Sequence, residues 1–153
     1  MEEQDSGELL REYNGLYQSY DDICHDIALA AGMSVTAFQI LYYLLENGDG
    51  CLQRDICAIT YTSKQTIHSA IQRLRDQGIL CLRPGKGRNM HIHLTEAGRQ
   101  LARERVLPAI RLEQAVFEAL TPEESRELLR LTGKYLDLFR QKAEPYINEA
   151  KQG

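Results

Sequence analysis

The sequence predicts a mainly α-helical fold with one small β-hairpin, an α+β arrangement within a single domain over residues 1–153. Apolar residues recur at steps of three and four over most of the chain, which is the spacing of amphipathic helices. Residues 79–94 depart from this spacing: an apolar extended run, a glycine-containing turn and a segment that alternates apolar and polar side chains indicate two short strands. With 43% hydrophobic and 26% charged residues, the chain has the composition of a globular domain that buries a core.

Three helices are expected before residue 61. The first covers residues 7–31, where leucines, tyrosines and isoleucines recur with helical spacing. Ser34 can cap a second helix that ends at Asn47-Gly48, because glycine readily takes the left-handed conformation that stops a helix. After the turn at 48–50, a short helix runs from Leu52 to about Thr60, and its length makes it depend on tertiary contacts.

The fourth helix begins at a predicted capping box, Thr62-Ser63-Lys64-Gln65. In such a box, the side chains of Thr62 and Gln65 would satisfy each other's backbone at the start of the helix. The helix ends at Gly78. Its polar side chains lie off a single apolar stripe, which consists of Ile67, Ala70, Ile71 and Leu74.

A β-hairpin with a basic tip follows this helix. Ile79–Arg83 is a short extended run, residues 84–87 form a Pro-Gly-Lys-Gly turn, and Met90, Ile92 and Leu94 alternate with polar residues. A short helix, a tight connection, a second helix and a hairpin, in this order, are typical of a winged helix-turn-helix. We place this region at residues 34–98.

Two capped helices are predicted after the hairpin. Thr95 can cap a long helix to about Leu120, with a kink or break at Pro108, whose ring removes a backbone amide. Thr121-Pro122-Glu123-Glu124 is a second capping box with proline at the first helical position. The last helix should run from there to the neighbourhood of Pro145–Asn148.

Charge is distributed unevenly along the chain, whose net charge is −4. Residues 1–50 carry one basic and ten acidic side chains, residues 51–100 carry eight basic and three acidic ones, and residues 101–153 carry nine of each. A basic segment inside an acidic protein is typical of a nucleic-acid contact surface on a soluble scaffold.

Duplex DNA is therefore the expected partner. In a helix-turn-helix, the N-terminal part of the second helix enters the major groove, and a wing reaches the minor groove or the phosphates. The side chains placed to make these contacts are Ser63, Lys64, Gln65, Thr66, His68, Ser69, Arg73, Arg83, Lys86 and Arg88. For any one of the arginines alone, a solvated surface charge is the simpler interpretation.

Residues 62–80, together with the passage from Gly87 to Gly98 that contains Leu94-Thr95, closely resemble the MarR family of winged-helix regulators. The resemblance implies a dimeric repressor or activator whose wing arginine is Arg88. Two positions depart from the family pattern: Lys86 replaces a common aspartate, and Tyr61 stands where glycine often occupies the turn. The family typically couples a small ligand, a metal or thiol oxidation to DNA release, which implies an effector site.

A homodimer is also expected from the apolar surface of the terminal helices, at residues 7–31 and 99–148, which exceeds what a small DNA-reading domain could cover. Two recognition helices would then meet half-sites about one helical turn apart on a palindromic operator. Burial in an intramolecular core is the competing explanation for the same stripes. The candidate dimer residues are Leu9, Tyr13, Leu16, Tyr20, Leu136 and Phe139.

A possible small-molecule effector could be bound by an aromatic cavity lined by Tyr13, Tyr17, Tyr20 and Tyr42, although tyrosines at helical spacing also pack ordinary cores. Cys24-His25-Asp26 offers metal or redox groups, but adjacent helical residues point in different directions. His91 and His93 share one strand face and also suit phosphate or water. We expect no metal site and no cofactor. The four cysteines should be buried, reduced thiols.

Enzymatic activity is not expected, because the sequence has no phosphate-binding glycine loop, nucleophile elbow or metalloprotease helix motif. No apolar stretch is long enough to span a membrane, and the acidic N-terminus is unlike a secretion signal, so a cytoplasmic protein is expected. Two alternatives to a ligand-released repressor remain: a metal- or redox-responsive winged-helix regulator acting through Cys and His residues, and a winged-helix module for protein–protein contact.

Overall fold

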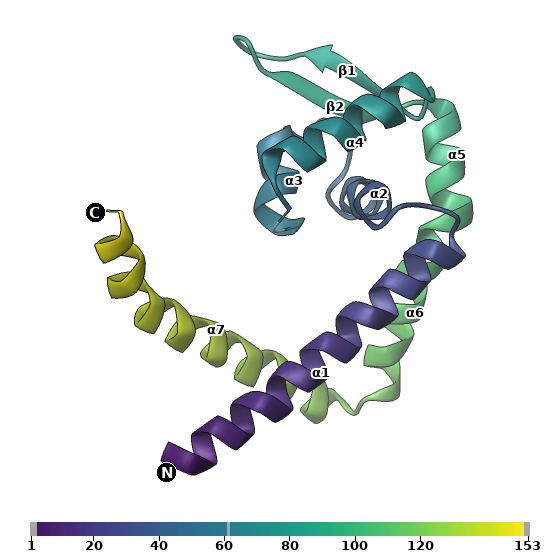
Figure 1. Ribbon diagram of the computed structural model, residues 1–153. Helices are drawn as coiled ribbons and strands as arrows, with labels where there is room; N and C mark the ends of the chain where they lie inside the picture. Colours follow the sequence, from purple (N-terminus) through teal and green to yellow (C-terminus); the bar gives the residue numbers. More distant parts are fainter. Residues whose placement is uncertain (1–2, 61, 152–153) are drawn as a thin grey trace. The chain divides into compact units, whose positions relative to one another are not determined.

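The computed structural model describes residues 3–60 and 62–151, and within this range it contains seven helices and one two-stranded hairpin (Figure 1). The predicted fold class, mainly helical with a small β-hairpin, is confirmed. The elements in chain order are α1 Glu3–Ala30, α2 Val35–Asn47, α3 Gln53–Thr60, α4 Lys64–Asp76, β1 Leu80–Pro84, β2 Met90–Leu94, α5 Glu96–Arg105, α6 Leu107–Ala119 and α7 Pro122–Ala150.

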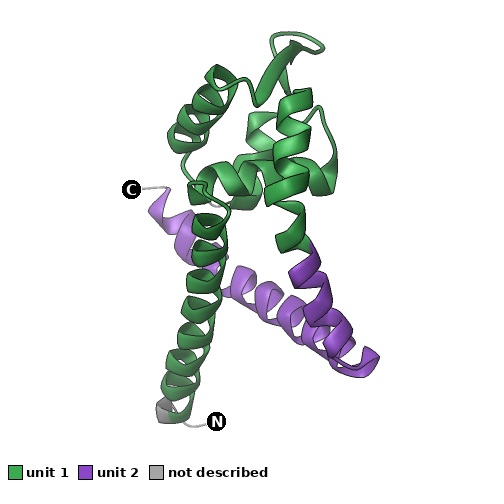
Figure 2. Cartoon of the chain, turned by 90° about the vertical axis from the view of Figure 1, so that its right-hand side faces the viewer, with its two compact units in different colours: residues 1–110 green, residues 111–153 purple. Residues whose placement is uncertain are grey.

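The chain divides into two compact units, Met1–Ile110 and Arg111–Gly153, shown in green and purple in Figure 2. The first unit holds α1 to α5, the hairpin and the start of α6. The second holds the rest of α6 and the whole of α7. The interpretation of residues 1–153 as a single domain stays a prediction.

The hydrophobic core of the first unit is built from the C-terminal end of α1, from α2, α3, α4, the hairpin and α5, and from the first turn of α6. The four predicted apolar positions of α4 are all buried, which confirms the helical period assigned to that segment. Burying a leucine or isoleucine side chain contributes roughly 1.5–3 kcal/mol, so this stripe fixes α4 firmly with its polar face outward. The largest fully buried side chains are Ile40, Leu41, Leu44, Ile56, Ile67, Leu80, Ile92 and Val106.

The predicted caps are confirmed at three of four helices. The Ser34 hydroxyl accepts the Ala37 N–H at 3.2 Å, and α2 stops at Gly48, whose φ of +85° favours glycine. Thr95 caps α5, and at α7 Thr121 and Glu124 form the reciprocal capping box.

The capping box proposed at residues 62–65 is wrong. Ser63 is the cap of α4, because its Oγ accepts the Thr66 N–H at 3.1 Å. The Thr62 hydroxyl instead donates to the Thr60 carbonyl at 3.1 Å, which closes the end of α3. Gln65 is therefore the second residue of the helix, where its side chain cannot reach back to the capping residue's amide.

Proline has different effects in the two C-terminal helices. The long helix predicted after Thr95 breaks at Val106, between α5 and α6, and Pro108 lies in the first turn of α6, where a missing amide costs nothing. α7 continues through Pro145 to Ala150, slightly beyond its predicted end.

The hairpin is antiparallel, with Leu80 opposite Leu94 and Pro84 opposite Met90. A third segment joins it at Cys51, where the Ile92 N–H donates to the Cys51 carbonyl and the Gly50 N–H donates to the Ile92 carbonyl, both at 2.9 Å. α4 packs against β1, as well as against α2 and α3 (Figure 1). These contacts hold the hairpin and the outer face of α4 in one unit.

By length and apolar composition, no single helix among the described residues could cross a membrane. α1 and α2 satisfy those criteria only when they are taken together across a 90° bend.

Candidate DNA interface

The polar face of α4 is open to solvent along its first two turns. Lys64, Gln65 and His68 are exposed and lie off the buried stripe. Ser63 and Thr66 are also exposed, but they are already engaged with each other, with their hydroxyl oxygens 2.7 Å apart. A helix that presents exposed donors and acceptors at its N-terminal end has the geometry needed to meet base edges in a major groove.

The residues predicted to contact DNA further along α4 are partly buried or engaged in hydrogen bonds within the helix. Ser69 is half-buried, and its carbonyl accepts a hydrogen bond from the Arg73 Nε at 3.4 Å. Arg73 and Arg75 lie in the last turn, where positive charge is favourable at the negative end of the helix dipole. Arg75 pairs with Asp76, whereas Arg73 stays exposed.

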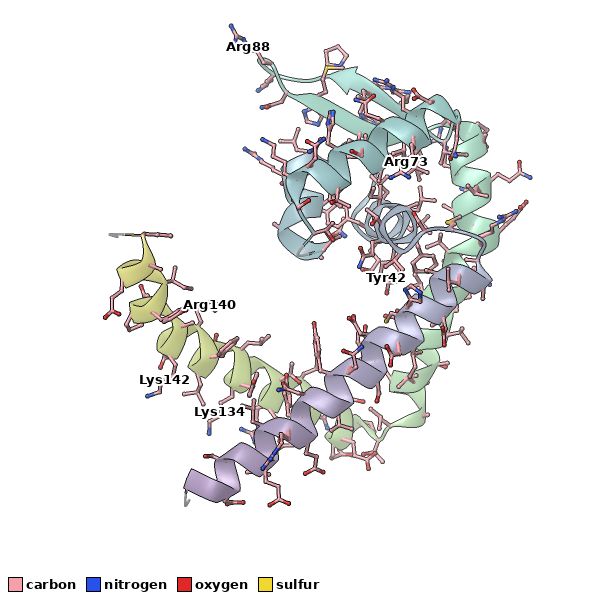
Figure 3. All side chains as sticks on the ribbon, viewed as in Figure 1. Tyr42, Arg73, Arg88, Lys134, Arg140 and Lys142 are labelled. Carbon is pink, nitrogen blue, oxygen red and sulfur yellow. The ribbon has the colours of Figure 1, made fainter. Side chains whose placement is uncertain are left out.

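The hairpin carries a set of cations that the protein itself does not neutralise. Arg83 is exposed on β1, and Lys86 and Arg88 are exposed in the loop between the strands. Figure 3 shows Arg88 at the outer end of the hairpin. Within the described residues, neither these three side chains nor Lys64 form an ion pair. Free cations on a protruding hairpin are suited to phosphates or to a minor groove.

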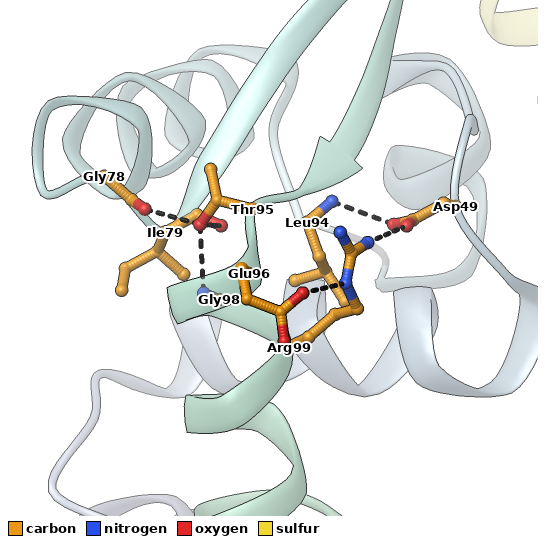
Figure 4. A network of polar contacts seen from close by, with 8 residues as sticks. All are labelled: Asp49, Gly78, Ile79, Leu94, Thr95, Glu96, Gly98 and Arg99. Atoms are coloured by element: carbon orange, nitrogen blue, oxygen red, sulfur yellow. Dashed lines mark hydrogen bonds and ion pairs between the residues drawn. The ribbon is translucent and has the colours of Figure 1, made fainter.

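A polar network fixes the inner end of this hairpin (Figure 4). One carboxylate oxygen of Asp49, in the turn before α3, accepts the Leu94 N–H at 2.8 Å. The other oxygen lies 2.9 Å from Nη1 of Arg99 in α5, and Arg99 also contacts Glu96 at 3.3 Å. Asp49 therefore joins three segments that are far apart in sequence: the α2–α3 turn, the end of β2 and the first turn of α5.

Thr95 makes the second part of the same network (Figure 4). Its N–H donates to the Ile79 carbonyl at 3.0 Å, and its hydroxyl donates to the Gly78 carbonyl at 2.6 Å. The same hydroxyl oxygen accepts the Gly98 N–H at 3.0 Å. The end of α4, the start of β1 and the start of α5 are thus connected by one side chain.

Replacing Asp49 with alanine should lower the free energy of unfolding by about 1–3 kcal/mol, because it leaves the part-buried Leu94 N–H without an acceptor and Arg99 without a partner. Glu96→Gln is the matched control, since it removes only an exposed pairing of Arg99 and should cost at most about 0.5 kcal/mol. Urea denaturation of both variants measures the difference. Equal stability of the two variants would contradict the anchoring role of Asp49.

Three residues that position this site could not be identified from the sequence: Asp49, Arg99 and Gln53. Gln53 begins α3, and its side-chain amide donates to the Lys64 carbonyl at 3.2 Å while its Oε1 lies 3.2 Å from Nδ1 of His68. Only the polarity of these residues was visible in the sequence, because their partners are 11 to 50 positions away.

The four cysteines are not joined by disulfide bonds, and each is half-buried rather than fully buried as predicted. Burial, with the Asp55 carboxylate adding to it, raises the pKa of the Cys51 thiol to about 11. A thiol with such a pKa stays protonated at neutral pH and is a weak nucleophile. Cys24, the candidate for redox sensing, is half-buried on α1, beside exposed His25 and Asp26, and that role stays a prediction.

His91 and His93 both lie close to Gly50, in the segment before α3. The His91 Nδ1–H donates to the Gly50 carbonyl at 2.6 Å, and both rings are half-buried. In residues 3–60 and 62–151, no group of three or more His, Cys, Asp or Glu side chains is placed to hold a metal ion.

The tyrosines proposed for an effector cavity differ in their surroundings. Tyr13, Tyr17 and Tyr20 lie along α1 with 38%, 61% and 56% of their surface exposed. Tyr42, labelled in Figure 3, is half-buried on α2. Its ring centroid lies 6.2 Å from that of Phe38. The effector cavity stays a prediction. Tyr61, predicted to occupy the turn between α3 and α4, lies outside the described residues.

Large apolar side chains are exposed on α1 and on α7. In the first unit, Leu9, Leu16 and Tyr20 are 49%, 68% and 56% exposed. In the second unit, α7 has no buried residue along its length, and Leu136 and Phe139 are 49% and 60% exposed. Exposed large apolar side chains, where they gather on one helix face, usually mark an interface.

The sequence model of the MarR family matches residues 31–88, which include α2, α3, α4 and β1. No curated protein sequence matches the chain. The fold is similar to that of many solved structures. NMB1585, a MarR family regulator from Neisseria meningitidis, is 23% identical with a TM-score of 0.68, over 91% of this chain and 98% of that one.

Two further solved structures carry functional information about the proteins they contain. BpsR of Bordetella bronchiseptica, whose DNA binding is regulated by 6-hydroxynicotinic acid, is 27% identical with a TM-score of 0.62, over 86% of this chain and 92% of that one. MepR of S. aureus, solved as a complex with DNA, is 18% identical with a TM-score of 0.66, over 84% and 96%.

Proposed function

Because residues 31–88 match the sequence model of the MarR family, we propose that the protein is a transcription regulator of this family that binds duplex DNA in a sequence-specific manner. The observation that carries the proposal is the pairing of two features on one unit. The open polar face of α4 and the unneutralised cations of the hairpin are both held there by the packing of α4 on β1.

In the proposed complex, the first two turns of α4 lie in the major groove. Gln65 and His68 meet base edges, while Lys64 and the free amides at the helix start meet a phosphate. Arg88 enters the adjacent minor groove or grips its phosphates, and Lys86 and Arg83 add phosphate contacts. Lys86 replaces the aspartate that would orient the wing arginine, so this wing relies more on electrostatic attraction than on a fixed arginine geometry. Ser63, Thr66, Ser69 and Arg73 complete the proposed contacts.

We further propose that two copies associate through α1 and α7. Both helices expose apolar side chains that a monomer would leave in water. A two-fold dimer places its recognition helices about 34–36 Å apart, one turn of B-form DNA, and so favours a palindromic operator.

The proposed physiological role is repression in the cytoplasm, relieved when a small ligand changes the spacing of the two recognition helices. BpsR, which shares the fold and 27% identity, has its DNA binding regulated by an aromatic acid. The tyrosines of α1 and Tyr42 are the candidate contacts for such a ligand, since an aromatic ring stacks well on tyrosine.

Arg88→Ala should weaken binding to DNA about equally on all sequences and lower the slope of log affinity against log salt by about one unit, because one counterion-releasing contact is lost. Fluorescence anisotropy, with a duplex selected by the protein from a random pool and with an unrelated duplex, measures both effects.

Arg111→Ala is the matched control for this measurement, since it removes an exposed arginine from α6, outside the hairpin. It should leave affinity and salt slope unchanged. If Arg88→Ala behaves like Arg111→Ala, the hairpin does not contact DNA and the proposed interface is wrong.

A further inference from the structure

Three polar side chains form a row across the outer face of α3 and α4. Gln53 contacts His68, and His68 in turn lies 3.5 Å, through Nε2, from the side-chain nitrogen of Gln72. His68 is exposed, while Gln53 and Gln72 are half-buried beside it. The row lies on the same face as Lys64, one helical turn before His68.

The orientation of the Gln53 amide follows from its second partner. A backbone carbonyl only accepts hydrogen bonds, so the Gln53 nitrogen must face the Lys64 carbonyl, at 3.2 Å. The Gln53 oxygen then faces Nδ1 of His68, at 3.2 Å. Because an amide oxygen also only accepts, the proton of His68 must be on Nδ1.

The position of this proton also determines the role of Nε2, the other ring nitrogen of His68. A neutral imidazole carries one N–H, so Nε2 of His68 holds a lone pair and acts as an acceptor. The Gln72 amide, which donates toward Nε2, agrees with this assignment. The free protein therefore presents an acceptor, rather than a donor, at the exposed tip of His68.

We propose that Gln53 is a specificity-determining positioning residue, which acts through His68 and does not itself touch DNA. With Nε2 as an acceptor, His68 selects a base that offers an amino group in the major groove, namely adenine through N6 or cytosine through N4. The opposite tautomer would donate, and would favour guanine or the O4 of thymine. The long contact to Gln72 gives way when a base takes its place. This role rests on the proposed binding of α4 in a major groove.

The size of the effect follows from one hydrogen bond. An intramolecular hydrogen bond of ordinary net strength changes the ratio of two states about five-fold. Loss of the Gln53 contact should therefore shift the tautomer ratio of His68, and its base preference, by about that factor.

The first test needs no DNA. Nitrogen chemical shifts of the imidazole at pH 8, where an imidazole is normally neutral, report which nitrogen carries the proton. We expect wild-type His68, assigned by loss of its signals in His68→Asn, to be protonated on Nδ1. Gln53→Met should move the proton population about five-fold toward Nε2. Gln53→Glu, whose carboxylate also only accepts, should retain the proton on Nδ1. Gln100→Met, an exposed glutamine on α5, is the control and should change nothing.

The second test is selection of bound sequences from a random duplex pool by wild type, Gln53→Met and Gln100→Met. The preference for adenine or cytosine at one position of each half-site should fall about five-fold in Gln53→Met alone. A wild-type proton on Nε2, or a base preference that Gln53→Met leaves intact, would overturn the role of Gln53. A wild-type protein that selects no sequence at all would instead overturn the proposed function, and the base-reading role with it.

Discussion

Gly98→Ala should lower the free energy of unfolding by about 2–3 kcal/mol, although alanine favours a helix more than glycine does. A Cβ atom at position 98 would overlap the backbone carbonyl oxygen of Ile79 and approach Cδ2 of Leu94 at 3.3 Å. The Ile79 carbonyl accepts the Thr95 N–H, so it cannot move away from position 98 without breaking this hydrogen bond between the hairpin and α5. The helix-propensity gain of about 0.5–1 kcal/mol does not offset this collision.

Thermal and urea denaturation measure this loss. Gly7→Ala is the matched control, because position 7 lies in α1 and has open space around an added Cβ. Its stability should stay within about 0.5 kcal/mol of the wild type. If Gly98→Ala is as stable as Gly7→Ala, the close approach of Gly98 in α5 to the Ile79 carbonyl is contradicted.

Leu136→Asp combined with Phe139→Asp should convert the protein to a monomer and weaken binding to a selected palindromic duplex by about 100-fold or more. Buried charge in an apolar interface is strongly unfavourable, and a single recognition helix loses the gain from engaging two linked half-sites. The change should not unfold the chain, because neither side chain is buried within it. Light scattering gives the mass in solution, and anisotropy gives the affinity.

Gln141→Asp combined with Asn148→Asp is the control on the same helix. Both positions are exposed and lie on the side of α7 away from Leu136 and Phe139, so they add the same charge without entering the proposed interface. This variant should remain dimeric. Persistence of the dimer in Leu136→Asp/Phe139→Asp would place the interface elsewhere.

The helices and the hairpin could be predicted because their signals are local. The four buried residues of α4 recur with the helical period, and Ser34, Thr95 and Thr121 each stand three residues before an amide that they bond. The start of α4 was misplaced by one residue because Thr62 and Ser63 are adjacent hydroxyls that can both cap. In the structure Ser63 accepts the Thr66 N–H, whereas Thr62 donates to the Thr60 carbonyl, a bond that depends on how α3 ends.

The outward direction of Lys64, Gln65 and His68 also followed from periodicity, because a residue off the apolar stripe must face solvent. The hydrogen-bonding partners of the site residues could not be predicted from periodicity. Gln53 and His68 are 15 positions apart, and Asp49 and Arg99 are 50 apart, so those contacts exist only after the helices have packed. Polar pairing across elements leaves no period in a sequence, whereas apolar burial does.

The hydrogen bonds of Thr95 and Asp49 couple the orientation of the hairpin to that of α5. The inner ends of both strands are anchored near α5, β1 through the adjoining Ile79 and β2 through Leu94, so a tilt of the first turn of α5 would be transmitted to the hairpin. Five strand residues span about 16 Å at about 3.3 Å each. A tilt of α5 by about 10° therefore sweeps Arg88 sideways by about 3 Å, which exceeds the distance tolerance of a hydrogen bond.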